Sequence, residues 1–244
     1  MRETSILSSI PTKLNRKDVF ILEGIRYAFN IIQLSYDTLF EELTIISKME
    51  KTEKINSQHY YSIFKEAWAI IDFSWKLRNL IIQIDSPDSA AQKEFNEESG
   101  QVLNMDFFSK IRDFRNTFQH LDERIGEVIV QENDSVWGNI SWIYVIDRQT
   151  IHSCLLYPGH PRTSSDIINP GGLRIDSPVC HITLTSINRK RDKLKINISD
   201  FMIELDEFMK KLESILLKQF RNMDYSKRLA QDMIFRAEIS FKKN

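Results

Sequence analysis

The sequence predicts a mainly α-helical protein in which a small antiparallel β-sheet interrupts the helices. Apolar residues recur every three or four positions, the period of an amphipathic helix, in the stretches 17–48, 57–84, 107–125 and 199–215. Across residues 126–198 the period changes to two, and Gly and Pro separate short apolar runs, a pattern typical of strands and turns. Helical spacing then returns. We therefore expect a helical bundle with a sheet between its third and fourth long helices.

Composition and charge limit the classes of protein to consider. The chain has 244 residues, 42% hydrophobic and 27% charged, which is enough for one extended domain or a core domain with a smaller one attached. The net charge of −1 excludes a global basic field, so a nucleic acid would have to be bound by local clusters. Two cysteines, Cys154 and Cys180, argue against a disulfide framework and fit a reducing compartment.

Targeting and membrane signals are not found in the sequence. The first residues carry no long apolar segment with the flanks of a signal peptide, and no apolar run is long enough to span a bilayer. We expect a cytoplasmic protein with no membrane partner.

The first two helices follow a stretch without any period. Residues 1–16 contain Pro11 and scattered Ser and Thr, and are expected to form a flexible arm. Ser57 is a candidate N-cap for the second helix, which has apolar stripes on two sides and should therefore lie between neighbours. Asp72 and Arg78 interrupt these stripes. They are either buried polar residues tied to the third helix or part of an exposed strip, and general burial frequencies favour the exposed strip.

The third long helix is expected to carry the functional residues. A polar connection over residues 85–103 leads to Asn104 as its candidate N-cap. Advancing about 100° per residue places Asn116 and His120 on the polar side, with Arg112 beside them and Arg115 on the shoulder between the two sides. The opposite side carries the apolar stripe, which comprises Phe107, Ile111, Phe114, Phe118, Leu121 and Ile125.

The sheet is expected to contain five short strands, at 128–130, 140–146, 151–157, 179–187 and 194–198. The densest basic cluster, residues 189–195, falls at the tip of the last hairpin, and Arg189, Lys190 and Arg191 are its candidate RNA-binding residues. This cluster could hold an RNA backbone, but a charged turn that keeps the sheet edge hydrated is the favoured interpretation. A weaker helix is expected at 225–241. The predicted domains are the bundle, at 17–125 and 199–244, and the sheet subdomain at 126–198.

The arginine, asparagine and histidine of the third helix carry a resemblance to a known family. Asn116 follows Arg115 directly, and four residues separate Arg115 from His120. In this spacing, and in its place in the third helix of a predicted bundle, the chain resembles the HEPN superfamily of bundle-forming nucleases and toxin-associated domains. The resemblance covers the helical parts, and the sheet looks like an insertion. In one branch of the family a tyrosine that an antitoxin modifies lies two positions after the histidine; Asp122 stands there in this chain.

The resemblance implies a metal-independent endoribonuclease that works as a homodimer, with two such helices forming one composite cleft. Histidine has an unperturbed pKa of about 6.5, so His120 could accept the proton of an RNA 2′-hydroxyl or protonate the leaving oxygen. Arg115 could bind two oxygens of the phosphorane-like transition state, and Asn116 could orient the imidazole or a phosphate oxygen. No cofactor is expected. The resemblance also implies a toxin or defence setting, in which an antitoxin or regulatory protein would be a partner.

The same residues have a second interpretation. An Arg and a His on a polar helical side are more often hydrated surface than catalytic groups, and Arg115 could pair with Asp122 or Glu123 of the same helix. Some HEPN relatives are inactive. The alternative is therefore a catalytically silent dimeric module that binds a protein or RNA.

A zinc site is the remaining candidate, and we do not expect one. His152 and Cys154 would share one side of a strand, but the adjacent Cys180 and His181 would point to opposite sides. The spacing also differs from the Cys-x-x-Cys pairs of structural zinc sites. A packed cysteine and surface histidines are the favoured interpretation.

Overall fold

The protein is described by a computed structural model. It describes residues 6–11, 13–49, 56–84, 105–120, 137–147, 150–158, 177–188 and 192–220, together with four residues of the C-terminal tail, Asp232, Ile234, Arg236 and Ala237. Several predictions fall on other positions and lie outside the described residues: the strand at 128–130, the N-cap at Asn104, the stripe residues Leu121 and Ile125, and the basic residues Arg189, Lys190 and Arg191.

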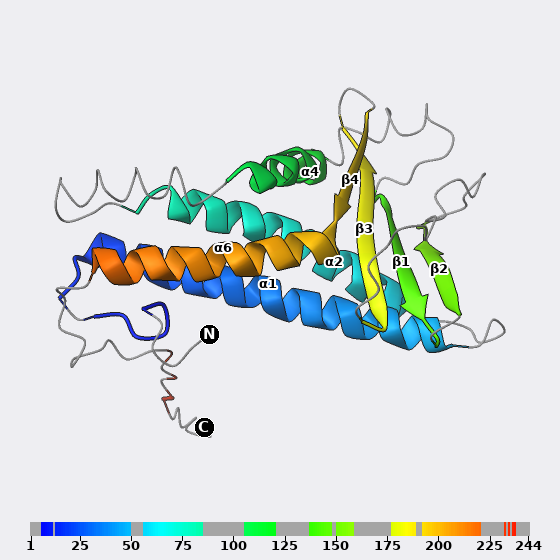
Figure 1. The fold of residues 1–244 in the computed structure, drawn as a ribbon, viewed down its shortest axis with the longest axis horizontal. Coiled ribbons are helices and arrows are strands. Elements are labelled where there is room, and N and C mark those ends of the chain that lie inside the picture. Colours follow the sequence, from blue (N-terminus) through cyan, green and yellow to red (C-terminus); the bar gives the residue numbers. More distant parts are fainter. Residues whose placement is uncertain are drawn as a thin grey trace, which may run out of the picture.

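The fold is helix-rich with a small four-stranded antiparallel sheet, as the coarse sequence prediction states. Three long helices, α1, α2 and α6, run along the molecule, and the shorter α4 lies near α2 and the sheet (Figure 1). The helices are α1 (Arg16–Lys48), α2 (Ser57–Ile81), the 3-10 turn η1 (Asp106–Phe108), α4 (Ser109–Gln119) and α6 (Ile198–Gln219).

Helix α1 forms where the helical period over residues 17–48 predicts it. Asn15 caps it by accepting a hydrogen bond from the backbone N–H of Asp18 at 2.9 Å. Ile25, Ile32 and Leu39 along one side are fully buried. This side faces α2, with which α1 makes its main contacts.

Helix α2 lies between α1 and α4, as its two apolar stripes predict. Its N-cap is Asn56 and not Ser57, because the Asn56 side chain accepts from the backbone N–H of Gln58 at 3.0 Å. The second stripe is buried in its middle and exposed at its ends: Trp68 is 3% exposed, whereas Tyr61 and Ile82 are 72% and 60% exposed. This stripe comprises Tyr61, Phe64, Trp68, Ile71, Trp75 and Ile82.

The N-terminal segment corrects the prediction of a flexible arm over residues 1–16. Ile6, Leu7 and Ile10 are at most 2% exposed and belong to the main hydrophobic core. Burial of these side chains removes apolar surface from water and fixes the segment, although it has no helical or strand period. Residues 1–5 lie outside the described part.

The sheet consists of β1 (Asn139–Val145), β2 (Ile151–Leu156), β3 (Val179–Ile187) and β4 (Lys193–Asn197), in the order β2-β1-β3-β4. All neighbours are antiparallel. Strand β3 contains a bulge, since His181 and Ile182 together lie opposite Trp142, and His181 has a positive φ of 53°. The edge strand β4 exposes Lys193 and Lys195, which protects that edge from further pairing.

Sheet and helices share one hydrophobic cluster. Leu184 of β3 and Ile140 of β1 are fully buried in the same cluster as the long helices. Trp142 donates from Nε1 to Oγ of Ser47 at 2.8 Å, which attaches β1 to the C-terminal end of α1. The sheet is therefore packed onto the helices through a common core, while the division into two predicted domains stays a prediction.

The C-terminal tail corrects the prediction of a helix over residues 225–241. None of the four residues described there is helical, and Asp232 has a positive φ of 47°. A right-handed helix needs a negative φ, so the conformation in which Asp232 contacts α1 is incompatible with it.

Candidate functional site

Helix α4 presents its polar residues to solvent. Ile111 and Phe114 are at most 1% exposed and anchor one side of α4 in the core. Arg112, Asn116 and His120, at successive intervals of four residues, are all exposed. The three predicted polar residues therefore lie along the accessible side of the segment.

His120 does not lie inside a helix that continues to residue 125. Helix α4 ends at Gln119, and His120 is its C-cap with φ −113° and ψ 31°, outside the helical range. The rest of the predicted helix, residues 121–125, lies outside the described part. The imidazole is thus carried by the first turn after the helix, while Asn116 is carried by the helix itself.

Arg115 is held by a residue from another helix. Its Nε lies 3.4 Å from Oδ1 of Asp72 in α2, and Lys76 Nζ lies 2.6 Å from Oδ2 of the same carboxylate. The Asp72 and Arg115 side chains are 30% and 26% exposed. The favoured prediction of a simple exposed strip was therefore wrong for Asp72, which is half-buried and tied to the third helix.

Arg78, the other polar interruption of α2, is also half-buried. Its guanidinium lies over the ring of Trp75, 4.7 Å from the centroid, and it donates to Oδ1 of Asn79 at 3.2 Å. Both of these contacts, with Trp75 and with Asn79, are within α2 itself.

A cavity of about 1110 Å³ opens beside the Arg115–Asp72 pair. Its lining comes from α2, from Phe118 of α4, from Trp137 before β1 and from residues 155–158 at the end of β2. We call it the aromatic pocket. Three of its α2 members, Tyr61, Phe64 and Trp68, belong to the second apolar stripe of that helix. An apolar stripe with an exposed end was therefore the sequence signal for the pocket.

The zinc candidates do not form a cluster. Strand β1 lies between β2 and β3, so Cys154 on β2 and Cys180 on β3 are two strands apart. Across the described residues, no group of three or more His, Cys, Asp or Glu side chains is arranged to hold a metal ion. Burial raises the pKa of the Cys154 thiol, and a hydrogen bond with Ser47 opposes this effect.

Residues 189–191 of the basic cluster come between β3 and β4 in the sequence. Asn188 and Asp192 close the connection: the Asn188 N–H donates to the Asp192 carbonyl at 2.9 Å, and the Asp192 N–H donates to Oδ1 of Asn188 at 2.8 Å. The three basic residues between them lie outside the described part, so their contact with RNA stays a prediction.

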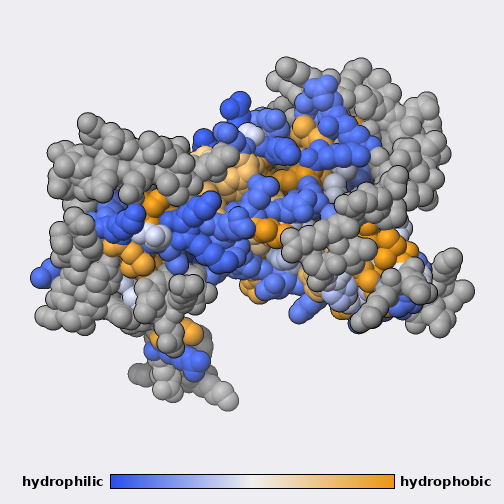
Figure 2. Space-filling view, in the orientation of Figure 1, coloured by the Kyte–Doolittle hydropathy of each residue, from blue (hydrophilic) through white to orange (hydrophobic). Residues whose placement is uncertain are grey.

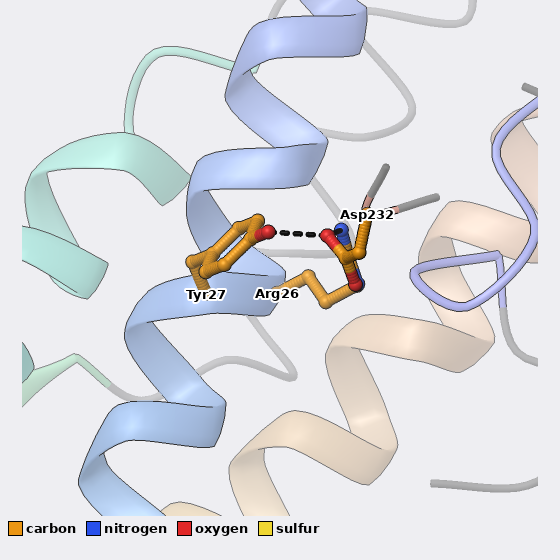
Figure 3. Close-up of polar contacts among 3 residues, drawn as sticks. All are labelled: Arg26, Tyr27 and Asp232. Carbon is orange, nitrogen blue, oxygen red and sulfur yellow. Dashed lines mark hydrogen bonds and ion pairs between the residues drawn. The ribbon is translucent and has the colours of Figure 1, made fainter. Parts of the chain in front are cut away.

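A polar cluster that the sequence analysis missed joins the tail to α1 (Figure 3). Nη1 and Nη2 of Arg26 donate to the two carboxylate oxygens of Asp232 at 2.9 and 3.0 Å, and the Tyr27 hydroxyl donates to the same carboxylate. These hydrogen bonds, that of Arg26 first, lower the pKa of Asp232 to about 2. The partners are 206 positions apart, and no local pattern points to their pairing.

Comparison with protein-family models, with curated proteins and with solved structures gave no match. In the part of the chain that the structure describes, every helix falls short of the length and apolar character that a membrane crossing requires. Among the residues that Figure 2 colours, hydrophilic ones predominate, with apolar residues at the surface near α4 and at the sheet end.

Proposed function

We propose that this protein is a metal-independent endoribonuclease of the HEPN type that acts as a homodimer. The observation that carries the proposal is the exposure of Asn116 and His120, with Arg112, along one side of α4. Burial of these side chains in the core would have excluded a phosphodiester from them. Their side of the helix is open to a strand of RNA and to a second copy of α4.

In the proposed reaction the RNA 2′-oxygen attacks the adjacent phosphorus, and the bond to the 5′-oxygen breaks. His120 of one copy accepts the 2′-hydroxyl proton, and His120 of the other copy donates a proton to the departing 5′-oxygen. Arg115 neutralises the charge that develops on the phosphoryl oxygens, and Asn116, four residues before His120, orients the imidazole or a phosphate oxygen. The products are a 2′,3′-cyclic phosphate and a 5′-hydroxyl.

The ion pair with Asp72 bears on the role of Arg115. A guanidinium bound through Nε keeps its two Nη atoms for a second anion, so the pair orients Arg115 without occupying all of its donors. The helical bundle, the sheet as an insertion into it, the cytoplasmic setting and a toxin or defence role with a neutralising partner belong to the same proposal.

The test is cleavage of a mixed RNA pool in EDTA by the wild-type protein and by His120→Ala. We expect fragments with 2′,3′-cyclic phosphate ends from the wild type and a loss of at least a hundredfold in rate for the variant. His152→Ala, which removes an exposed histidine on β2, is the matched control and should cleave normally. A wild-type protein that is monomeric by sedimentation, or cleavage that survives His120→Ala, would contradict the proposal.

The second candidate function is a catalytically silent dimeric module that binds a protein or RNA partner. The engagement of Arg115 by Asp72 favours it, because a guanidinium with a carboxylate partner is partly neutralised before any phosphate arrives. His120→Gln separates the two: a ribonuclease loses cleavage and any toxicity on expression while keeping its fold, and a binding module is unaffected.

A further inference from the structure

The aromatic pocket has an ordered inner layer. The rings of Trp68 and Phe118 stack with centroids 4.6 Å apart and an interplanar angle of 18°, and Phe118 meets Trp137 at 6.0 Å. The indole N–H of Trp68 donates to the backbone carbonyl of Trp137 at 3.3 Å. The inner rings are therefore held by contacts among α2, α4 and Trp137, which precedes β1, and the site is built before any ligand arrives.

Large aromatic rings also remain exposed at the pocket. Tyr61 is 72% exposed and Trp137 is 46% exposed, and both line the cavity. Flat apolar surface left in water at a cavity of about 1110 Å³ is surface that a planar ligand can cover.

The charges around the pocket favour an anionic ligand. Lys65 and Asp72 line it; Lys65 pairs with Glu66 at 2.7 Å, and Asp72 is contacted by both Lys76 and Arg115. One lysine and one carboxylate thus line the pocket itself, and two further cations, Lys76 and Arg115, adjoin that carboxylate. An apolar peptide would gain nothing from these cations, whereas a planar ligand that carries a phosphate would.

The position of the pocket links it to the candidate catalytic residues. Phe118, which contributes to the inner layer, lies three positions after Arg115 and two before His120. Because Phe118 belongs to the apolar side of α4, the pocket adjoins Arg115, which lies one turn before Phe118 and pairs with the lining residue Asp72.

We propose that the aromatic pocket binds one nucleobase of a single-stranded RNA, with the adjoining phosphate at the Lys65, Lys76 and Arg115 cations. Aromatic side chains stack on an unpaired base irrespective of its identity, and cations nearby hold the backbone. The pocket is thus a subsite that holds the strand beside Arg115, which pairs with the lining residue Asp72. The inference rests on the proposed ribonuclease function, since it names a base-binding subsite for that substrate.

The test measures RNA binding in a His120→Ala background, where the strand stays intact. Tyr61→Ala and Trp137→Leu should each weaken binding of a labelled single-stranded RNA about tenfold. Phe20→Ala removes an aromatic ring that is 58% exposed on α1, outside the pocket lining, and is the matched control; it should leave the affinity unchanged. Circular dichroism and thermal melting establish that each variant is folded.

Two further ligands test whether the base is needed for binding, and whether the pocket prefers an RNA strand or a free nucleotide. A strand of the same length without bases should bind at least tenfold more weakly than the RNA, because it lacks the ring that stacks. AMP should quench tryptophan fluorescence and compete with the RNA; AMP that binds as tightly as the strand would identify a free nucleotide as the ligand.

The proposal is overturned if the pocket variants bind RNA like the wild type, if the strand without bases binds equally well, or if neither RNA nor AMP binds. Binding only of an amphipathic helical peptide would overturn it in favour of a protein partner. Cleavage, assayed separately with His120 intact, distinguishes the two claims. Pocket-dependent binding without cleavage removes the nuclease function alone, and cleavage that is indifferent to Tyr61 and Trp137 removes the subsite alone.

Discussion

The Nε atom of Arg115 in α4 lies 3.4 Å from Oδ1 of Asp72 in α2. This contact joins the helix with the candidate catalytic residues to the helix that lines most of the aromatic pocket. Asp72 is shared with Lys76, one turn further along α2, at 2.6 Å.

Replacing Asp72 by Asn should alter activity more than stability. The pair is partly exposed, so its loss should lower the free energy of unfolding by only about 0.5 to 1 kcal/mol in urea titrations. If Asp72 orients Arg115, RNA cleavage should fall clearly, and Asp72→Asn should have little further effect once Arg115 is Ala. Lys210→Ala, which breaks an exposed pair with Asp206 on α6, is the control. Additive losses for the Asp72 and Arg115 variants would show that the contact does not orient the guanidinium.

Removing the Phe108 ring should strongly lower the stability of the folded protein. Phe108 is fully buried, and its ring lies 5.6 Å from that of Phe208 in α6. We expect Phe108→Ala to lower the free energy of unfolding by about 3 to 5 kcal/mol, measured by denaturant titration. Phe20→Ala, with its ring 58% exposed, should cost less than about 0.5 kcal/mol. Equal effects of the two changes would contradict the assignment of Phe108 to the core.

The Arg26–Asp232 contact should depend on pH at the acid end of the scale. The pKa of Asp232 falls from its usual 3.8 to about 2 when its carboxylate is bound by Arg26 and Tyr27. The docked tail binds fewer protons than the free one, so the contact is at full strength above pH 3.8 and weakens as the pH falls toward 2.

Hydrogen exchange of the tail measures how strongly the Asp232 carboxylate holds the tail on α1. At pH 7, Asp232→Asn should speed exchange in peptides that contain residue 232, because the charged hydrogen bonds are lost. Asp206→Asn, which breaks an exposed pair with Lys210 on α6, is the matched control and should leave the tail unchanged. Identical tail exchange in the wild type and Asp232→Asn would show that the carboxylate does not dock the tail.

Two glycines should respond differently to substitution by Ala. Gly138 has a φ of +78°, and a Cβ there would lie 2.2 Å from the backbone oxygen of Thr185. Gly138→Ala should therefore cost about 2 kcal/mol or more, since neither the positive φ nor the neighbouring strand can adapt cheaply. Gly24→Ala in α1 would meet only the flexible end of Leu80 at 3.0 Å and gains helix propensity, so we expect a change within about 1 kcal/mol. Thermal unfolding of both variants measures the difference.

Local periodicity was sufficient to predict the long elements. The three-four spacing from Leu22 onward predicted a helix at 17–48, and α1 spans Arg16–Lys48. The alternating runs predicted β3 at its observed bounds and the other described strands to within one residue at each end. The apolar pattern of a helix or strand repeats along the chain, so several neighbouring residues indicate the same secondary structure.

Features that depend on distant residues could not be predicted in this way. Nothing near Asp72 in the sequence indicates Arg115, and nothing near Asp232 indicates Arg26. The bulge at His181 is a relation between two strands and leaves no mark in either one alone. The burial of Ile6 and Leu7 was not predicted because the apolar residues of this segment follow neither a helical nor a strand period.

The packing of η1 against α6 has a consequence for synthesis of the chain. Phe107 and Phe108 find their aromatic partners in Phe201 and Phe208, with ring centroids 5.4 to 6.2 Å apart. A ribosome adds roughly 5 to 20 residues per second, so several seconds separate the emergence of the two pairs. During that interval the two phenylalanines that come first are uncovered and open to chaperones or to other nascent chains. Slowing translation before α6 should therefore increase aggregation of this protein more than slowing it after α6.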